Sequence, residues 1–298
     1  AMEQALKLVK APLRVVEVAS PEQAPGPSRG QAGHSPGAVS VLDTHNLEPS
    51  SITIGKVSAA AGKASMEWVT KAAELCLSGQ VAAMCTAPVN KEAAALGGVV
   101  EVGHTELLAK LCKASPVVTM LITGRLRCAH LTTHYSLRKA CDYVRKDYIL
   151  SRLEILHRDL ARWGMPRARI AVAALNPHGS DGGLLGDEEQ KEIAPAVQAA
   201  RAKGINAIGP VPADSVFVQA IAGQYDVVLA MYHDQGHIPI KVHGWERSIS
   251  VNLGLPLIRT SVDHGTAFDI AGKGIADATS MMEALKAAAS LASGKGLP

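Results

Sequence analysis

Three histidines from separate parts of the chain are the strongest candidates for chemistry. Each follows closely on a short apolar run, and they are His134, His178 and His233. Such runs are typical of buried strands, and ligands of open α/β sheets bind beyond the carboxyl ends of the strands. Three neutral imidazoles that leave coordination positions open are typical of a catalytic Zn²⁺ or a similar divalent ion. Each histidine alone could be structural, but the three together favour a metal site.

Two aspartates are expected to act beside these histidines. Asp214 and Asp234 are the carboxylates that would orient the imidazoles or transfer protons. His237 and His243 lie further past the strand end, and the sequence gives them no role.

Two cations and a helix start indicate that the same cleft binds an anion. Lys241 and Arg259 each stand in an otherwise apolar stretch, where an ordinary surface charge is a weaker explanation. The turn Gly103–Glu106 adds His104, the hydroxyl of Thr105 and backbone N–H groups. Thr105 is predicted to cap a helix over Glu106–Cys112, whose amino terminus would favour a phosphate.

Alternating apolar runs and helical segments predict the elements that position these residues. Buried strands are predicted at Val81–Cys85, Val117–Ile122, Cys128–Leu131, Ile170–Leu175, Val227–Met231 and Ile249–Leu257. Helices are predicted at Tyr148–Trp163, Asp187–Lys203 and Met281–Ala292. This order is typical of an α/β fold with a mainly parallel sheet and helices on both faces. Polar motifs that follow five of these strands are expected to converge on one cleft.

Composition excludes several other classes of protein. The 298 residues are 47% hydrophobic and carry a net charge of +3, with basic and acidic residues interspersed. Only 3% of them are aromatic, so a nucleic-acid-binding face is not expected. No apolar run approaches the roughly 18–20 residues that span a bilayer, and no signal peptide is evident. Five cysteines without CxxC spacing are expected to be reduced thiols in a cytoplasmic protein.

Two further segments of the sequence bear on the site. The stretch Ser20–Gly37 is rich in Pro, Gly and Ser, and it predicts an exposed loop in which His34 is solvated. The chain contains neither GxGxxG after a strand nor GxxxxGK[ST]. The residues alone therefore predict a metal-and-anion cleft and identify no cofactor-binding residue.

Several strings resemble the 4-hydroxythreonine-4-phosphate dehydrogenase family of pyridoxal-phosphate biosynthesis. They are GHTE (103–106), TTH (132–134), NPHGSDGG (176–183), PADS (212–215), YHDQGHIPIK (232–241) and LGLPLIRTSVDHGTAFDIAGKG (253–274). The resemblance implies a two-lobed fold of the isocitrate/isopropylmalate-dehydrogenase type, with residues 1–105 and 267–298 in one lobe. Residues 106–266 would form the second lobe, with the metal site and the dimer interface.

The resemblance also implies cofactors and residue roles. The enzyme would be a cytoplasmic homodimer that uses NAD or NADP, with one divalent metal (Zn, or Mg, Co or Mn) in each site. Both subunits would supply the metal ligands, which map onto His134, His178 and His233. Substrate-binding positions map onto His104, Thr105, Lys241 and Arg259, together with Ser250 and Asn252 on one face of a strand. Asp214 and Lys241 map onto positions that take part in the chemistry.

The reaction that the resemblance implies is oxidation followed by decarboxylation. 4-Phosphooxy-L-threonine would become 3-amino-2-oxopropyl phosphate, with the metal lowering the pKa of the substrate hydroxyl and stabilising the enolate. Three alternatives stay open: the same chemistry on 4-phospho-D-threonate or 4-phospho-D-erythronate, a His₃-metal hydrolase or aldolase, and a catalytically silent truncated homologue.

The sequence departs from the family pattern in three places. A strand with a Gly-Asp-Pro-Ala-Gly-Ile-Gly-Pro-like turn is expected near the start, whereas this chain begins Ala1-Met2-Glu3 like a tag remnant before an internal start. Ser250 stands where the family has a substrate-contacting Asn, and Asn252 follows two residues later. The string GHIPIK resembles the paralogous branch that acts on phosphorylated four-carbon sugar acids or on aromatic cis-dihydrodiol carboxylates.

Overall fold

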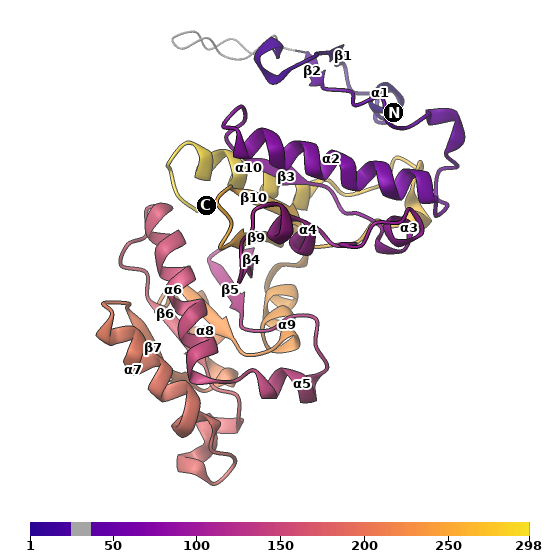
Figure 1. Ribbon diagram of the computed structural model, residues 1–298. Coiled ribbons are helices and arrows are strands. Elements are labelled where there is room, and N and C mark those ends of the chain that lie inside the picture. Colours follow the sequence, from indigo (N-terminus) through magenta and orange to yellow (C-terminus); the bar gives the residue numbers. More distant parts are fainter. Residues whose placement is uncertain (25–36, 298) are drawn as a thin grey trace. The chain divides into compact units, whose positions relative to one another are not determined.

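The computed structural model describes residues 1–24 and 37–297 (Figure 1). Most of the predicted loop Ser20–Gly37, with His34, therefore lies outside the described residues. The chain divides into two compact units. The first comprises residues 1–82, 88–111 and 264–278, and the second comprises residues 83–87, 112–263 and 279–298. In the described part of the chain, no helix is long and apolar enough to cross a membrane.

The first unit is mainly helical. Its elements are α1 (Met2–Leu8), β1 (Arg14–Glu17), β2 (Ala38–Val41), α2 (Ala59–Leu77), α3 (Lys91–Leu96) and α4 (His104–Leu111). Strands β1 and β2 pair in parallel. Ser58 Oγ accepts a hydrogen bond from the Ala61 N–H and so caps α2. Because α4 begins at His104, two residues before the predicted start at Glu106, the prediction that Thr105 caps this helix is wrong; Thr105 lies inside the first turn.

The second unit is built on an eight-stranded sheet. Its strands are β3 (Met84–Thr86), β4 (Val118–Thr123), β5 (Leu126–His130), β6 (Ile170–Ala173), β7 (Ala207–Val211), β8 (Val227–Ala230), β9 (Ile249–Leu253) and β10 (Arg259–Val262). Their order is β3-β10-β9-β4-β5-β8-β6-β7. Four of the seven pairings are parallel and three are antiparallel.

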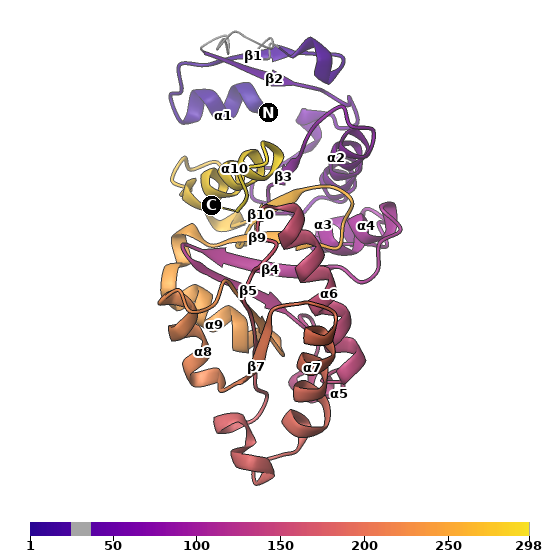
Figure 2. The ribbon, with the colours of Figure 1, turned by 90° about the vertical axis from the view of Figure 1, so that its left-hand side faces the viewer.

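Helices cover both faces of this sheet, because successive side chains of a strand point to opposite faces. On one face, α6 (Lys146–Arg162), α7 (Ala194–Ala202) and α10 (Thr279–Ala292) pack on one core cluster. On the other, α8 (Ala213–Ile221) and α9 (His233–Gly244) lie over a second cluster; Figure 2 shows α6 and α7 opposite α8 and α9. Helix α5 (Leu137–Asp142) follows β5. The predicted α/β class is confirmed.

Strand directions correct the expectation that five polar motifs converge on one cleft. Strands β5, β8, β6 and β7 are parallel neighbours, so the motifs that follow them share one edge of the sheet. Strand β9 runs the same way as β5, since both are antiparallel to β4. Strands β3 and β10 run in the opposite direction, so the residues directly after β3, which ends at Thr86, and residue Asp263 after β10 lie at the opposite edge.

Two segments have an internal structure that differs from the one predicted. Residues Ile249–Leu257 were expected as one strand, but β9 ends at Leu253, and Arg259 begins β10 instead of following a strand. The helix expected over Asp187–Lys203 begins with a π-helical turn, Glu189–Ile193, which continues into α7. The last helix, expected in the first lobe, packs against β9 and β10 of the second unit.

The close packing of α2 on α3 leaves no room for a side chain at Gly62. A Cβ at Gly62 would lie 2.1 Å from the backbone carbonyl carbon and oxygen of Ala93. Gly62→Ala is therefore expected to lower the free energy of unfolding in urea by about 2 kcal/mol, because the overpacking cost of about 3 kcal/mol exceeds the helix-propensity gain of about 1 kcal/mol.

Gly265→Ala is the matched control, because a Cβ there meets nothing within 4 Å. This change should leave the unfolding free energy within about 0.5 kcal/mol of the wild-type value. Equal stability of the Gly62→Ala protein and the wild type would contradict the packing of α2 on α3.

Candidate active site

The three predicted metal ligands lie on loops at one edge of the sheet. His134 is exposed in the loop after β5, His178 is in the turn Pro177–Gly183 after β6, and His233 is the first residue of α9 after β8. A cavity of about 160 Å³ joins two of these loops, since Thr133, His233 and Asp234 line it. Among the described residues of one chain, however, no three His, Cys, Asp or Glu side chains are grouped to hold a metal ion.

Carboxylates orient two of the three imidazoles. Nδ1 of His178 lies 3.2 Å from Oδ2 of Asp181, and Nδ1 of His233 lies 2.6 Å from Oδ1 of Asp234. A metal-binding histidine usually donates its other ring N–H to a carboxylate, which fixes the tautomer and the ring orientation. Both pairs leave Nε2 as the coordinating nitrogen. The donor set therefore fits a divalent metal, although one chain does not assemble it.

The turn that carries His178 has an unusual backbone. Residues His178 to Gly182 all have positive φ, including the non-glycine residues His178 (53°), Ser180 (71°) and Asp181 (45°). The left-handed region costs a non-glycine residue roughly 1–2 kcal/mol. Such conformations persist where surrounding contacts enforce them, and they cluster at functional sites. Here the turn holds His178 and Asp181 together at the edge of the sheet.

Helix α9 carries a line of polar side chains at helical spacing. His233, His237 and Lys241 are four residues apart and so lie on one face of the helix. The rings of His233 and His237 stack with centroids 3.6 Å apart, and His237 Nδ1 lies 3.0 Å from the His233 carbonyl oxygen. Burial, with a smaller contribution from His233, lowers the pKa of His237. Sequence analysis assigned His237 no role, although this spacing could have placed it beside His233.

Lys241 is held at the carboxyl end of β10. Its Nζ donates to the carbonyl oxygen of Asp263 at 2.6 Å and lies 2.7 Å from the Oδ2 carboxylate oxygen of the same residue. The hydroxyl of Ser248 donates to that carboxylate as well, and the ammonium lies 4.8 Å from the ring centroid of Trp245. The sequence motif includes Asp263 but does not predict its contact with Lys241, because the two residues are distant in sequence and only the fold brings them together.

Arg259 is a buried cation, exposed to only 4%. Its Nη2 and Nε donate to Thr86 Oγ1 at 2.7 and 3.1 Å, and its Nη1 donates to Asn252 Oδ1 at 2.6 Å. Burial lowers the pKa of Arg259 to about 10, so the guanidinium stays charged near neutral pH. In the described residues no carboxylate forms an ion pair with it. Neutral oxygens offset only part of the several kcal/mol that burying a charge costs, and this favours binding of an external anion.

Polar residues continue from Arg259 across the same face of the sheet. Asn252 lies opposite Thr119, and Ser250 lies between Leu121 and Ser261. Side chains two residues apart on a strand share a face, so Ser250 and Asn252 point the same way, as the sequence predicted. All of these positions are buried or nearly so, and Arg259 therefore has polar neighbours in place of a fully apolar core.

The remaining predicted residues belong to other elements. Asp214 is exposed in the first turn of α8. This helix follows β7, so Asp214 is on the edge of the sheet that carries the three histidines. His104 and Thr105 are half-buried in α4 of the first unit.

Four findings from comparison with known proteins bear on this site. Residues 1–288 match the family described as "Pyridoxal phosphate biosynthetic protein PdxA". The D-threonate 4-phosphate dehydrogenase of Cupriavidus necator is 44% identical over 292 residues, which is 98% of this chain and 85% of that protein. Its counterpart of the same name from Salmonella typhimurium is 46% identical over 262 residues, covering 88% of this chain and 80% of that protein. The crystal structure of 4-hydroxythreonine-4-phosphate dehydrogenase from Klebsiella pneumoniae superposes with a TM-score of 0.88 at 42% identity, covering 98% of this chain and 86% of that one.

The fold, the polar edge of its sheet and these similarities define a dehydrogenase that acts on a CH–OH group. The chain belongs to the PdxA family. The resemblance drawn from its sequence motifs is thereby confirmed.

A buried imidazole beside α9 generates a prediction about pH. His130 is 2% exposed, its ring centroid lies 4.6 Å from that of His237, and burial lowers its pKa to about 3. The unfolded chain, with a histidine pKa of 6.5, binds a proton that the folded chain excludes between these two values. The contribution of neutral His130 to the free energy of unfolding is therefore complete above about pH 6.5. It is lost as the pH falls toward 3, by about 1.4 kcal/mol per pH unit.

His130→Leu removes this titration and should flatten the acid side of the stability profile. The measurement is the free energy of urea unfolding at about pH 7 and about pH 5, where the variant should lose roughly 1–2 kcal/mol less than the wild type. Identical losses in the two proteins would show that His130 is not buried as a neutral ring.

Proposed function

We propose that the protein oxidises and decarboxylates 4-phospho-D-threonate, with NAD⁺ as oxidant and one divalent metal in each site. The observation that carries the proposal is the set of three histidines at one edge of the sheet, two of them with Nδ1 on a carboxylate. The names of the curated relatives support the substrate, since they read D-threonate 4-phosphate dehydrogenase. The names support neither the hydrolase nor the aldolase considered from the sequence.

A second substrate has support of its own. The family description refers to pyridoxal phosphate biosynthesis, and the Klebsiella pneumoniae structure is of a 4-hydroxythreonine-4-phosphate dehydrogenase. 4-Phosphooxy-L-threonine, the first expectation from the sequence, is therefore the alternative substrate. The two molecules differ chiefly at C2, which carries a hydroxyl in threonate and an ammonium in hydroxythreonine. Ser250 and Asn252, where the sequence departs from the family pattern, are the residues we assign to this difference.

Different residues of the chain have different proposed roles in substrate binding and proton transfer. Arg259 and Lys241 bind the anionic ends of the substrate and orient it, with His104 and Thr105 as further phosphate contacts. Thr86, Asn252 and Asp263 hold those two cations in place. Lys241 and Asp214 transfer protons. When bound at His134, His178 and His233, the metal would polarise the C3 hydroxyl and stabilise the enolate, while NAD⁺ would accept the hydride.

The atoms balance for either substrate. Loss of a hydride from C3 and of the C3 hydroxyl proton gives a β-keto acid, reduced nicotinamide and a proton. The bond from C2 to the carboxylate then breaks, CO₂ leaves, and the enolate takes up a proton at C2. Threonate would yield dihydroxyacetone phosphate, and hydroxythreonine would yield 3-amino-2-oxopropyl phosphate.

We further propose that the active protein is a homodimer whose subunits complete each metal site together. One chain does not group three metal-binding side chains among its described residues, yet two of the histidines have the carboxylate partners typical of ligands. Apolar side chains are also exposed on α9, where Ile238 is 59% and Val242 84% exposed. A second copy of the chain that covers this helix would bury both residues and bring its own histidine to the edge of the sheet.

The substrate is tested by the growth of reduced-nicotinamide absorbance. The metal-loaded protein is supplied with NAD⁺ and with either 4-phospho-D-threonate or 4-phosphooxy-L-threonine. We expect kcat/KM to be at least roughly 10-fold higher for threonate, because a site built for a C2 hydroxyl leaves a C2 ammonium poorly paired. Removal of the metal with a chelator should abolish turnover, and addition of the metal should restore turnover.

Each contrary result has a distinct meaning. A higher kcat/KM with 4-phosphooxy-L-threonine would overturn the substrate and keep the chemistry. Absence of turnover of both acids by the metal-loaded protein, with NAD⁺ and with NADP⁺, would refute the proposed function. Full activity after chelation would remove the metal from the mechanism.

A further inference from the structure

Three arginines from different segments of the second unit line one cavity of about 280 Å³. Arg125 lies in the turn between β4 and β5, Arg127 lies on β5, and Arg247 lies in a short 3₁₀ helix, Trp245–Arg247, before β9. The rest of the lining consists of Ile122, Gly124, Ile249 and Glu283. Because β5 and β9 begin here, the cavity is at the edge of the sheet opposite the three histidines.

Two of the three arginine charges at this cavity, those of Arg125 and Arg247, are not paired within the described residues. Arg125 and Arg247 share the lining with one carboxylate, Glu283, and that carboxylate already forms an ion pair of 2.8 Å with Lys286. Asp226, whose carbonyl oxygen accepts a hydrogen bond from Arg127, has its carboxylate bound by Arg169 at 2.9 and 3.0 Å. Throughout residues 1–24 and 37–297, neither Arg125 nor Arg247 is paired with a carboxylate. An excess of positive charge therefore surrounds the cavity.

The arginines also repel one another at this site. Burial lowers the pKa of Arg127; the charge of Asp226 opposes this shift, and the charge of Arg125 adds to it to a smaller extent. Like charges that are close and partly desolvated destabilise a fold unless an anion lies between them. Guanidinium groups bind phosphate with two parallel N–H···O bonds, and they are the side chains best suited to this geometry.

We propose that the pocket formed by Arg125, Arg127 and Arg247 binds the phosphate group of a small phosphomonoester. Its volume of about 280 Å³ suits a phosphate with a small organic remainder. Ile122 and Ile249 offer that remainder an apolar wall. The pocket belongs to the second unit alone and contains no residue assigned to the reaction, so its occupation is independent of the proposed function.

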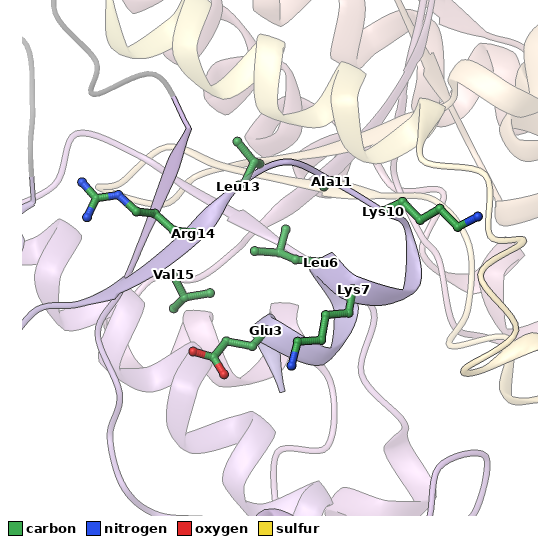
Figure 3. Close-up of a pocket in the computed structure, with 8 residues that line it drawn as sticks. All are labelled: Glu3, Leu6, Lys7, Lys10, Ala11, Leu13, Arg14 and Val15. Atoms are coloured by element: carbon green, nitrogen blue, oxygen red, sulfur yellow. The ribbon is translucent and has the colours of Figure 1, made fainter.

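A cavity in the first unit shows why convergence of charge matters. It measures about 530 Å³ and is lined by Lys7, Lys10 and Arg14 together with Glu3 and apolar residues. Figure 3 shows Lys10 and Arg14 extending in opposite directions. Its cations therefore do not converge on one point, and it carries no proposal.

The proposal is tested by equilibrium dialysis with radiolabelled inorganic phosphate at low ionic strength. The wild type is compared with Arg125→Gln/Arg247→Gln and with each single variant, and the fold is checked by circular dichroism. Arg125 and Arg247 are exposed, so the variants should fold normally. We expect the double variant to bind one phosphate fewer per chain, or to bind it at least roughly 10-fold more weakly, which corresponds to about 1.4 kcal/mol.

Arg162→Gln is the matched control, since Arg162 is an exposed arginine at the end of α6 and does not line the pocket. It should bind phosphate like the wild type. Equal phosphate binding by the wild type and the folded double variant would overturn the proposal, and so would the absence of any bound phosphate in the wild type at millimolar concentration.

Competition then distinguishes the sources of the phosphate group. Displacement by NADP⁺ and not by NAD⁺ would identify the 2′-phosphate of the cofactor. Displacement by glycerol 3-phosphate and not by NADP⁺ would identify a small phosphorylated metabolite. Either result supports a phosphomonoester site. Displacement by chloride at an equal concentration would overturn it, because the pocket would then be a general site for anions.

Discussion

The site depends first on the parallel pairing of β5 with β8 and of β8 with β6. Parallel neighbours end at the same edge of a sheet, so three loops that are far apart in sequence present His134, His233 and His178 on one side. Each strand is buried on both faces by the two core clusters. A slip of one residue in register would exchange these faces and is strongly opposed. The packing of the two apolar clusters thus determines the position of the loops that carry the histidines.

A second constraint is the buried charge of Arg259. The chain surrounds it with Thr86 and Asn252 instead of a carboxylate, which keeps the guanidinium positive and oriented without neutralising it. Lys241 is held differently, by the carboxylate and the carbonyl oxygen of Asp263. Under the proposed function, burial prepares Arg259 for an anionic ligand, whereas Lys241 would have to exchange or share its carboxylate partner when the ligand binds.

The sequence predicted the α/β class, most strands to within two or three residues, and the loops that bear the histidines, because apolar runs are local signals. It could not predict strand direction, and the expected convergence of all five motifs failed at β3 and β10. Asp263 beside Lys241 and Thr86 beside Arg259 were missed for the same reason, since these contacts join residues distant in sequence. His130 lies within an apolar run, so the sequence did not predict its low pKa. Only the packing of α9 on β5 explains this pKa.

We propose that the three histidines form the metal site of this dehydrogenase of the PdxA family. The most direct test is elemental analysis of the purified protein, in the wild type, in His178→Ala and in the control His243→Ala, whose exposed side chain lies at the opposite end of α9 from His233. The account predicts about one divalent metal per chain in the wild type and the control, and its loss in folded His178→Ala. Wild-type metal content in His178→Ala would contradict the account.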